Sequence, residues 1–350
     1  MRHAFRGRRG YVLMAFALSA LAVVGMVGLS IDLGRLYIAK QEAQAFVDAA
    51  SVAATLELDG TTAGIDRAKL AARADINRWN FGNTPFQTPV VEFATSATGP
   101  FSINPATASG VRFTRVTAQA DQSNYLLPVL KAPLKSTARA RAVAGQVPRT
   151  RFGEGAFPFS PMVHDELDPN FGFTPGQEYT LRWPPAPKDN KNNVCAGDRH
   201  NQWINKAEEG GSSERGFIEE ADAATIKLAV EGDYQTRPLE VGGTVIMSDG
   251  NKQTILDSLF VRIGQDSDTQ ASTYDHYNGN GRRLVVVPIN TWYPDFRIVG
   301  FASFLLLRAN EYNKGGNQGW CAEYIGPWVQ GSNTKGGGQG AGAYVVRLVE

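Results

Sequence analysis

The sequence predicts an α+β protein in which a single N-terminal transmembrane helix continues into a long stalk helix, followed by a small α+β unit and a β-rich C-terminal domain. Three observations predict this class. An apolar run without a charged residue lies near the start, a one-sided helical periodicity follows it, and alternating polar and apolar residues typical of strands recur after about residue 90. The expected parts are a basic tail at 1–10, a transmembrane helix at 11–31, a stalk helix at 32–60, an α+β unit at 61–147 and a β-rich domain with long loops at 148–350.

The apolar run from Tyr11 to Ile31 has the length of a membrane span. At about 1.5 Å of rise per helical residue it extends roughly 30 Å, which matches the hydrocarbon core of a bilayer. Four arginines precede it, whereas the charges that follow it are mixed in sign. Because positively charged flanks stay in the cytoplasm, we expect residues 1–10 to be cytoplasmic and residues 32–350 to lie across the membrane.

A cleaved signal peptide is the alternative interpretation of a basic start followed by an apolar run. The apolar core of a signal peptide is about 7 to 15 residues long and ends at a small-x-small cleavage site. Here the run is longer and leads directly into a second segment with helical periodicity. The length therefore favours a retained anchor.

The segment after the span is predicted to continue as a helix with one apolar face. Asp59 and Gly60 supply a stop signal at its end. Alanines dominate its more exposed half, so this stalk needs a partner surface, either the protein's own β-domain or neighbouring copies. Apolar residues recur at intervals of three, four or seven, at Leu33, Leu36, Tyr37, Ala43, Val47, Ala50, Ala54 and Leu58.

Beyond the stalk, the pattern predicts a second helix over 65–80 and half-buried antiparallel strands between 90 and 146. Residues 148–215 are rich in Pro, Gly and Asn and are expected to be mainly loops, with a short helix over 219–230 after them. Strand-like pieces return at 241–247, 282–289, 296–307 and 342–350, with a flexible Gly-rich loop at 331–342. The tryptophans at 292, 320 and 328 are interpreted as packing residues.

The net charge of +1 gives no electrostatic argument for a nucleic-acid partner. The two cysteines, Cys195 and Cys321, both lie in the part expected outside the cytoplasm, where oxidising conditions allow a disulfide. The sequence itself does not establish whether they meet. A zinc site would need histidines at ligand spacing, and His200 is the nearby candidate.

The sequence offers no constellation for catalysis or cofactor binding. His164, His200 and His276 are far apart and are interpreted as solvated loop residues, and no nucleophile motif or phosphate-binding loop occurs. Two acidic stretches, 121–125 and 266–269, depart from the register of known cation-binding loops and are interpreted as polar turns. We therefore predict no catalytic residues, no metal, no cofactor and no small-molecule substrate.

The first 60 residues resemble the N-terminus of TadG-like proteins of the tight-adherence (Tad/Flp) pilus assembly system, which carry a TadE/G-like region. The resemblance rests on a basic start, Gly10 before the apolar run, and IDLGRLYIAKQEAQAFVDAASVAA after it. Prepilins that are cleaved at such a glycine carry a Glu five residues later, but Ala15 stands here, which favours an uncleaved anchor over a major fibre subunit. The positions that carry the resemblance are Asp32, Gly34, Arg35, Tyr37, Gln44 and Asp48, with Ala49 and Ala50 after them.

The resemblance implies a non-enzymatic, single-pass protein of the bacterial inner membrane, with residues 32–350 in the periplasm. Its expected role is structural or accessory, in Flp pilus assembly or secretion, with other pilus-assembly membrane proteins contacted through the stalk helix. The alternative is a membrane-tethered binding module or enzyme that acts on cell-wall or extracellular material. That alternative predicts a deep polar pocket within residues 151–350, because the loops there are rich in aromatic residues.

Overall fold

The computed structural model describes residues 8–74, 78–80, 82–209, 214–218, 222–232, 234–235, 237–249, 254–312, 317–326 and 342–349. The chain divides into two compact units, one of residues 1–145 with 347–350 and the other of residues 146–346. The expected C-terminal domain ran to residue 350, whereas the last four residues belong to the first unit. Residues 1–7 of the expected tail at 1–10 lie outside the described residues. Trp328 and almost all of the Gly-rich loop also lie outside them.

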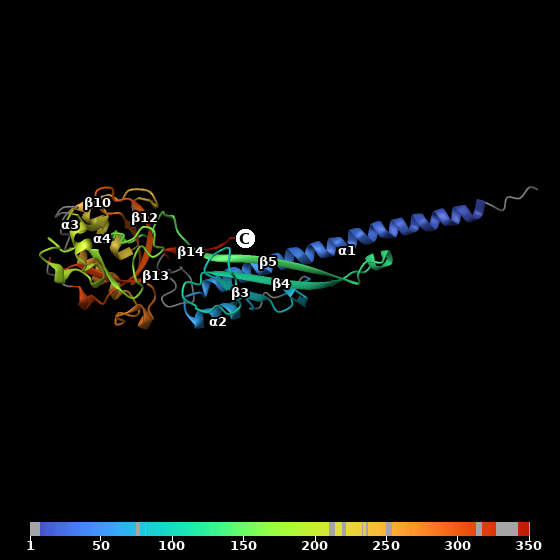
Figure 1. Ribbon diagram of the computed structural model, residues 1–350, viewed down its shortest axis with the longest axis horizontal. Coiled ribbons are helices and arrows are strands. Elements are labelled where there is room, and N and C mark those ends of the chain that lie inside the picture. Colours follow the sequence, from blue (N-terminus) through green and yellow to red (C-terminus); the bar gives the residue numbers. More distant parts are fainter. Residues whose placement is uncertain are drawn as a thin grey trace, which may run out of the picture. The chain divides into compact units, whose positions relative to one another are not determined.

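The apolar run and the stalk form one continuous helix, α1 (Arg8–Leu56), drawn in blue in Figure 1. No proline interrupts it. The helix ends four residues before Gly60, which adopts a left-handed backbone with φ of 80°. The predicted passage from span to stalk without a break is therefore confirmed.

The rest of the first unit is a four-stranded sheet with a short helix. Helix α2 (Thr62–Ala71) is capped by Thr61, whose hydroxyl accepts a hydrogen bond from the amide of Gly64 at 3.0 Å. The sheet order is β14-β5-β4-β3, and β3, β4 and β5 are antiparallel. The strands of this unit are β1 (Arg78–Trp79), β2 (Thr84–Pro85), β3 (Val90–Ala94), β4 (Phe113–Ser123), β5 (Lys135–Pro148) and β14 (Tyr344–Leu348), with the 3-10 helix η1 (Leu127–Leu130) between β4 and β5.

The second helix was expected over 65–80, and this extent is wrong. The helix ends at Ala71, and Trp79 lies instead in β1, which pairs with β2. The amide of Asn80 donates a 2.6 Å hydrogen bond to the Glu42 carboxylate of α1. Pairing with β2 and the contact of Asn80 with α1 thus replace the expected end of the helix with a short strand and a turn.

The stalk half of α1 packs on its own sheet. β4 alternates between buried and less buried residues along its length, as a strand does when one face meets a helix. Alanines on both surfaces let the helix and the sheet approach closely. Leu33 and Tyr37, expected on the apolar face, are 47% and 64% exposed. The core of this unit includes Ala39, Ala43, Phe46, Val47, Ala50 and Ala54 of α1 and Val116, Ala118, Ala120, Ala138, Ala140 and Ala142 of the sheet.

The second unit is built on a four-stranded antiparallel sheet of order β11-β12-β13-β7. Its central core is aromatic and aliphatic, and every residue of β11 is buried. Its strands are β6 (Arg151–Phe152), β7 (Glu178–Arg182), β8 (Glu214–Ile218), β9 (Leu239–Glu240), β10 (Met247–Asp249), β11 (Leu284–Asn290), β12 (Ile298–Leu306) and β13 (Trp320–Gly326). Its helices are α3 (Asn201–Glu209), α4 (Ala223–Gly232) and α5 (Ile255–Gly264), with short 3-10 turns η2 (Lys191–Asn193), η3 (Ala196–Asp198), η4 (Tyr274–His276) and η5 (Ala309–Glu311).

The strands expected at 282–289 and 296–307 are present as β11 and β12, which pair with each other. The strand expected at 241–247 is wrong, because that segment is a turn followed by irregular chain with one isolated bridge at Thr244, and β10 begins only at Met247. β7 lies in the segment expected to be mainly loops, and its neighbour in the sheet, β13, was also missed. Trp292 and Trp320 are buried, as expected for packing residues. The α+β class is confirmed.

Candidate membrane anchor and stalk helix

The first part of α1 exposes its apolar side chains in the isolated chain. Leu13, Phe16 and Leu18 are 74%, 75% and 66% exposed. Among the described residues, α1 is the helix long and apolar enough to cross a membrane. A helix that is apolar on every side and has no protein around it needs an apolar solvent. This part of α1 is the candidate anchor.

Asp32, the first polar residue after the span, fixes the turn between β4 and β5 to α1. Its carboxylate accepts hydrogen bonds from three successive amides, those of Tyr125 at 3.1 Å, Leu126 at 2.9 Å and Leu127 at 2.8 Å. Only 2% of Asp32 is exposed. These amides open η1 and have no partner inside it, so the aspartate caps this 3-10 helix from another element.

Two further residues of α1 hold the same turn. The guanidinium of Arg35 lies 4.2 Å from the centre of the Tyr125 ring and donates to the carbonyl of Ser123 at 3.4 Å. Gly28 faces Leu126 so closely that a Cβ at position 28 would lie 2.8 Å from the Leu126 Cβ. A larger residue at position 28 would therefore push the turn away from the helix.

The remaining resemblance positions divide between the sheet and open surface. Gln44 donates to the Asp48 carboxylate at 2.8 Å and to the carbonyl of Arg141 in β5 at 3.3 Å. Gly34 has open space around it, and nothing in the structure explains a glycine there. Tyr37 is exposed. Among the positions that carry the resemblance, Asp32 and Arg35 thus attach α1 to the end of the hairpin, and Gln44 attaches the body of the stalk to β5.

A shallow apolar groove of about 90 Å³ lies between α1 and the end of α2. Helix α1 provides one aromatic side chain and three alanines to it. Such a row of small residues allows another helix to approach closely. The lining residues are Phe46, Ala49, Ala50, Ala53, Ala71, Ala72 and Ala74.

Among the described histidines, His164 departs from the environment that was expected for it. His164 was expected to be solvated, and this is wrong, because its side chain is 7% exposed and its Nε2 lies 2.7 Å from Asp198 Oδ1. Its ring stacks on Trp203 with centroids 4.0 Å apart. The other Asp198 oxygen accepts a bond from the amide of Thr180 at 2.5 Å. This arrangement is a buried structural pair that ties the loop before β7 to the segment after it.

The acidic loop at 266–269 is built around hydrogen bonds. Asp266 accepts bonds from the hydroxyl of Tyr277 at 2.6 Å and from the amide of Arg283 at 2.7 Å. Asp268 accepts from the amides of Gln270 and Asn278. Burial raises the pKa of Tyr277, so its hydroxyl stays protonated as the donor. Among the described residues, no three His, Cys, Asp or Glu side chains lie together as metal ligands would.

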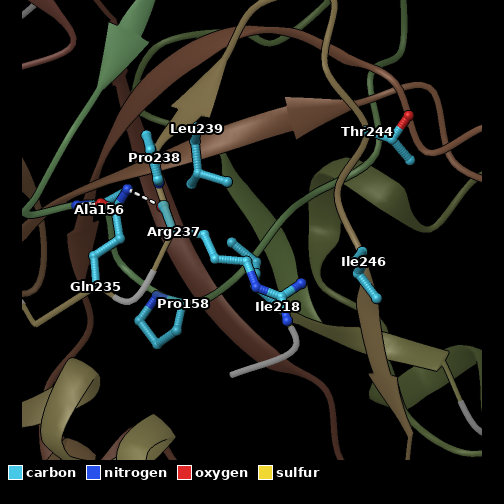
Figure 2. Close-up of a pocket in the computed structure, with 9 residues that line it drawn as sticks. All are labelled: Ala156, Pro158, Ile218, Gln235, Arg237, Pro238, Leu239, Thr244 and Ile246. Atoms are coloured by element: carbon cyan, nitrogen blue, oxygen red, sulfur yellow. Dashed lines mark hydrogen bonds between the residues drawn. The ribbon is translucent and has the colours of Figure 1, made fainter. Parts of the chain in front are cut away.

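A small cavity of about 80 Å³ in the second unit is drawn in Figure 2. Arg237 is the charged residue in its lining, and Gln235 accepts a 2.9 Å hydrogen bond from the amide of Ala156. The volume is a fraction of the roughly 300 to 1,000 Å³ of ligand pockets. The lining contains no carboxylate, histidine or cysteine. This cavity does not provide the deep polar pocket that an enzyme acting on the cell wall would require. Its lining is Ala156, Pro158, Ile218, Gln235, Arg237, Pro238, Leu239, Thr244 and Ile246.

Cys195 and Cys321 form a disulfide, with their Cα atoms 5.6 Å apart. It joins the residue before η3 to β13 across 126 positions of sequence. The predicted bridge is therefore present. It closes the loop-rich segment that follows β7 onto the main sheet of this unit.

These features define an α+β protein with one candidate membrane helix in its described part, and with a β-hairpin clasped to that helix where the apolar run ends. Residues 10–74 match the family model described as Flp pilus-assembly TadE/G-like, and the N-terminal region is thus TadE/G-like. The match covers α1 from Gly10 onward together with α2. None of the curated proteins and none of the solved structures compared with this chain matches it. The Tad pilus-assembly family is generally structural rather than enzymatic.

Proposed function

We propose that this protein is a single-pass component of the bacterial inner membrane with a structural or accessory role in Flp pilus assembly or secretion. Residues 11–31 cross the membrane, residues 1–10 are cytoplasmic and residues 32–350 are periplasmic. The observation that carries the proposal is the TadE/G-like match over residues 10–74, which includes the exposed apolar helix to which the hairpin is hydrogen-bonded. The protein would act by holding a folded periplasmic region at the membrane surface.

Two independent features support the direction of insertion. The arginines before the apolar run are expected to remain in the cytoplasm. The disulfide between Cys195 and Cys321 belongs to the opposite end of the chain and is typical of an oxidising compartment such as the periplasm. Both support a periplasmic location of the second unit.

Localisation of the native protein tests the anchor. We expect it in the inner-membrane fraction after a carbonate wash, with the N-terminal mass of an uncleaved chain. Protease added to spheroplasts should digest residues 32–350 and leave a fragment that contains the span. A soluble native form that begins after Ile31 would contradict the proposal.

Deletion of the gene tests the role in assembly. We expect cells without the protein to lose surface Flp pili, and cells that carry the full chain on a plasmid to regain them. The control is a version in which an unrelated membrane span replaces residues 11–31, with Gly28 retained at its place. Normal pili in the deletion strain would contradict a role in assembly.

A further inference from the structure

We propose that the end of the β4–β5 hairpin, residues 124–134, lies at the depth of the membrane and forms a second contact with the bilayer. The hairpin end would enter the lipid interface on the periplasmic side, beside α1. This inference rests on the proposed function, because it requires that residues 11–31 span the membrane. The occupant of this surface is lipid, namely the headgroup region and the first part of the acyl chains.

The register between the hairpin and α1 sets the depth. Ser123 contacts Arg35, Tyr125 contacts Asp32, and Leu126 contacts Gly28. As the chain leaves β4 it therefore moves toward the N-terminal end of α1 and into the apolar run. Gly28 lies three residues inside the end of the span at Ile31, about 4.5 Å along the axis. A bilayer that surrounds Gly28 must also reach Leu126. The green segment between β4 and β5 follows α1 in this way in Figure 1.

The composition of the hairpin end suits the interface between lipid and water. The run YLLPVLKAPL contains one charged residue, Lys131. Tyr125 and Leu134 are 65% and 74% exposed in the isolated chain, although both are large and apolar in their bodies. Tyrosine is enriched at the level of lipid headgroups, and a lysine can extend its amine toward water while its stem stays among lipids. In the proposed position, lipid rather than water contacts these exposed apolar side chains, which water solvates unfavourably.

Several backbone amides of the hairpin end already have partners within the protein. Asp32 accepts the amides of residues 125–127, and Pro128 and Pro133 have no N–H to satisfy. The amides of Lys131 and Ala132 donate back to Pro128 and Leu127 at 3.0 and 3.3 Å. The Asn124 side chain donates to the carbonyl of Pro133 at 2.8 Å. Paired backbone groups are what a segment needs in order to enter an apolar medium.

Spin labels on the full-length protein in vesicles of phosphatidylethanolamine and phosphatidylglycerol test this inference. The two native cysteines are paired, so one added cysteine can be labelled at a time. Leu134→Cys reports the hairpin end, Arg139→Cys on β5 is the matched control, and Leu21→Cys reports the span. Collision of each label with oxygen, which concentrates in lipid, and with a water-soluble nickel complex gives its depth.

We expect the label at position 134 to be accessible to oxygen at the depth of the headgroup boundary, and the label at 139 to be accessible to nickel. Equal nickel access at 134 and 139, with position 21 deep in the bilayer, would overturn the inference and leave the anchor intact. Protection of position 134 from both reagents would indicate a protein contact and would also overturn it. Nickel access at position 21 would refute the anchor itself, and the inference with it.

Discussion

At the scale of single residues, the contact between Asp32 and three amides of the hairpin end links the TadE/G-like motif to a physical task. An aspartate directly after an apolar span is costly if its carboxylate has no partner. Here it accepts bonds from amides that no neighbour within η1 can satisfy. Asp32, Arg35 and Gly28 together hold the hairpin end against α1.

Replacement of Asp32 is expected to release the hairpin end. In Asp32→Ala, the amides of residues 125–127 lose their acceptor, and their hydrogen exchange should accelerate about tenfold or more in detergent micelles. Asp32→Asn keeps one carbonyl oxygen and should give an intermediate rate. The control is Asp48→Ala, which removes a carboxylate that accepts from Gln44. Unchanged exchange in Asp32→Ala would refute this role.

Gly28 is expected to be sensitive to any added side chain, because a Cβ there meets the Leu126 Cβ at 2.8 Å. Gly28→Val should widen the distance distribution between spin labels at Lys40 and Lys131, as measured by double electron–electron resonance. Gly34→Ala is the matched control, since nothing lies within 4 Å of a Cβ at that position. Equal distributions in the two variants would show that the close approach at Gly28 has no consequence.

At the scale of elements, pairing of β7 with β13 places two carboxylates opposite each other. Glu178 and Glu323 occupy paired positions in the register of these strands. Burial raises the pKa of both, and the charges of Glu311 on Glu178 and of Asp275 on Glu323 raise it further. Like charges in directly opposite positions of a sheet oppose pairing. The pairing of β7 with β13 should therefore weaken at this position as the two carboxylates ionise.

The second unit should lose stability as the pH rises from about 4.5 through the raised pKa values of Glu178 and Glu323. In that interval the unfolded chain has released these protons, whereas the folded state still holds them. The Glu178→Gln variant should therefore melt at a higher temperature than the natural protein at pH 7, with the difference shrinking at pH 4. Glu240→Gln, on the exposed side of β9, controls for net charge. A constant difference at both pH values would contradict the assignment.

Loss of the disulfide is expected to destabilise the second unit selectively. The bridge closes a loop across 126 positions, and bridges of this kind contribute about 2 to 5 kcal/mol to the free energy of unfolding. The double variant Cys195→Ala with Cys321→Ala should require less denaturant to unfold that unit. Hydrogen exchange at residues 125–127 serves as the internal control and should not change. Equal denaturation midpoints would contradict the prediction.

At the scale of the whole molecule, one chain carries two four-stranded sheets, and the first of them is completed by β14, from the end of the chain. β14, from the end of the sequence, pairs with β5, and the amide of Val349 donates to Val143 at 2.8 Å. The first unit thus needs both ends of the chain. The alanine groove beside α1 is a surface of that unit that could accommodate a partner helix.

A photocrosslinking amino acid at Ala49 is expected to capture another pilus-assembly membrane protein in cells. Ala49 lines the groove, and small residues around it leave room for a helix. The same amino acid at Lys40, exposed on another face of α1, is the control. Crosslinks of equal yield at both positions, or none at Ala49, would argue against the groove as the contact.

The sequence predicted those features that local periodicity encodes. The apolar helix, the stalk and the paired strands β11 and β12 follow from composition and spacing, whereas the sequence left open whether the two cysteines meet. β7 and β13 were missed because their burial depends on distant partners, and the second helix was overextended because contact with α1 keeps Trp79 in a strand. The hairpin end carried a detectable signal, an apolar run between polar strands, but no partner could be assigned to it.

The sequence by itself determined that the segment near the start is long and apolar enough to span a membrane, because it carries no charge and a helix pairs its own peptide groups, both of which lipid requires. It also determined the α+β class through its changes of period. Only the tertiary structure decided that the stalk packs on its own sheet, that Asp32 caps a turn 93 positions away, and that His164 is buried against Asp198. These contacts join residues that no local window contains, so they form only when the unit that holds them has folded.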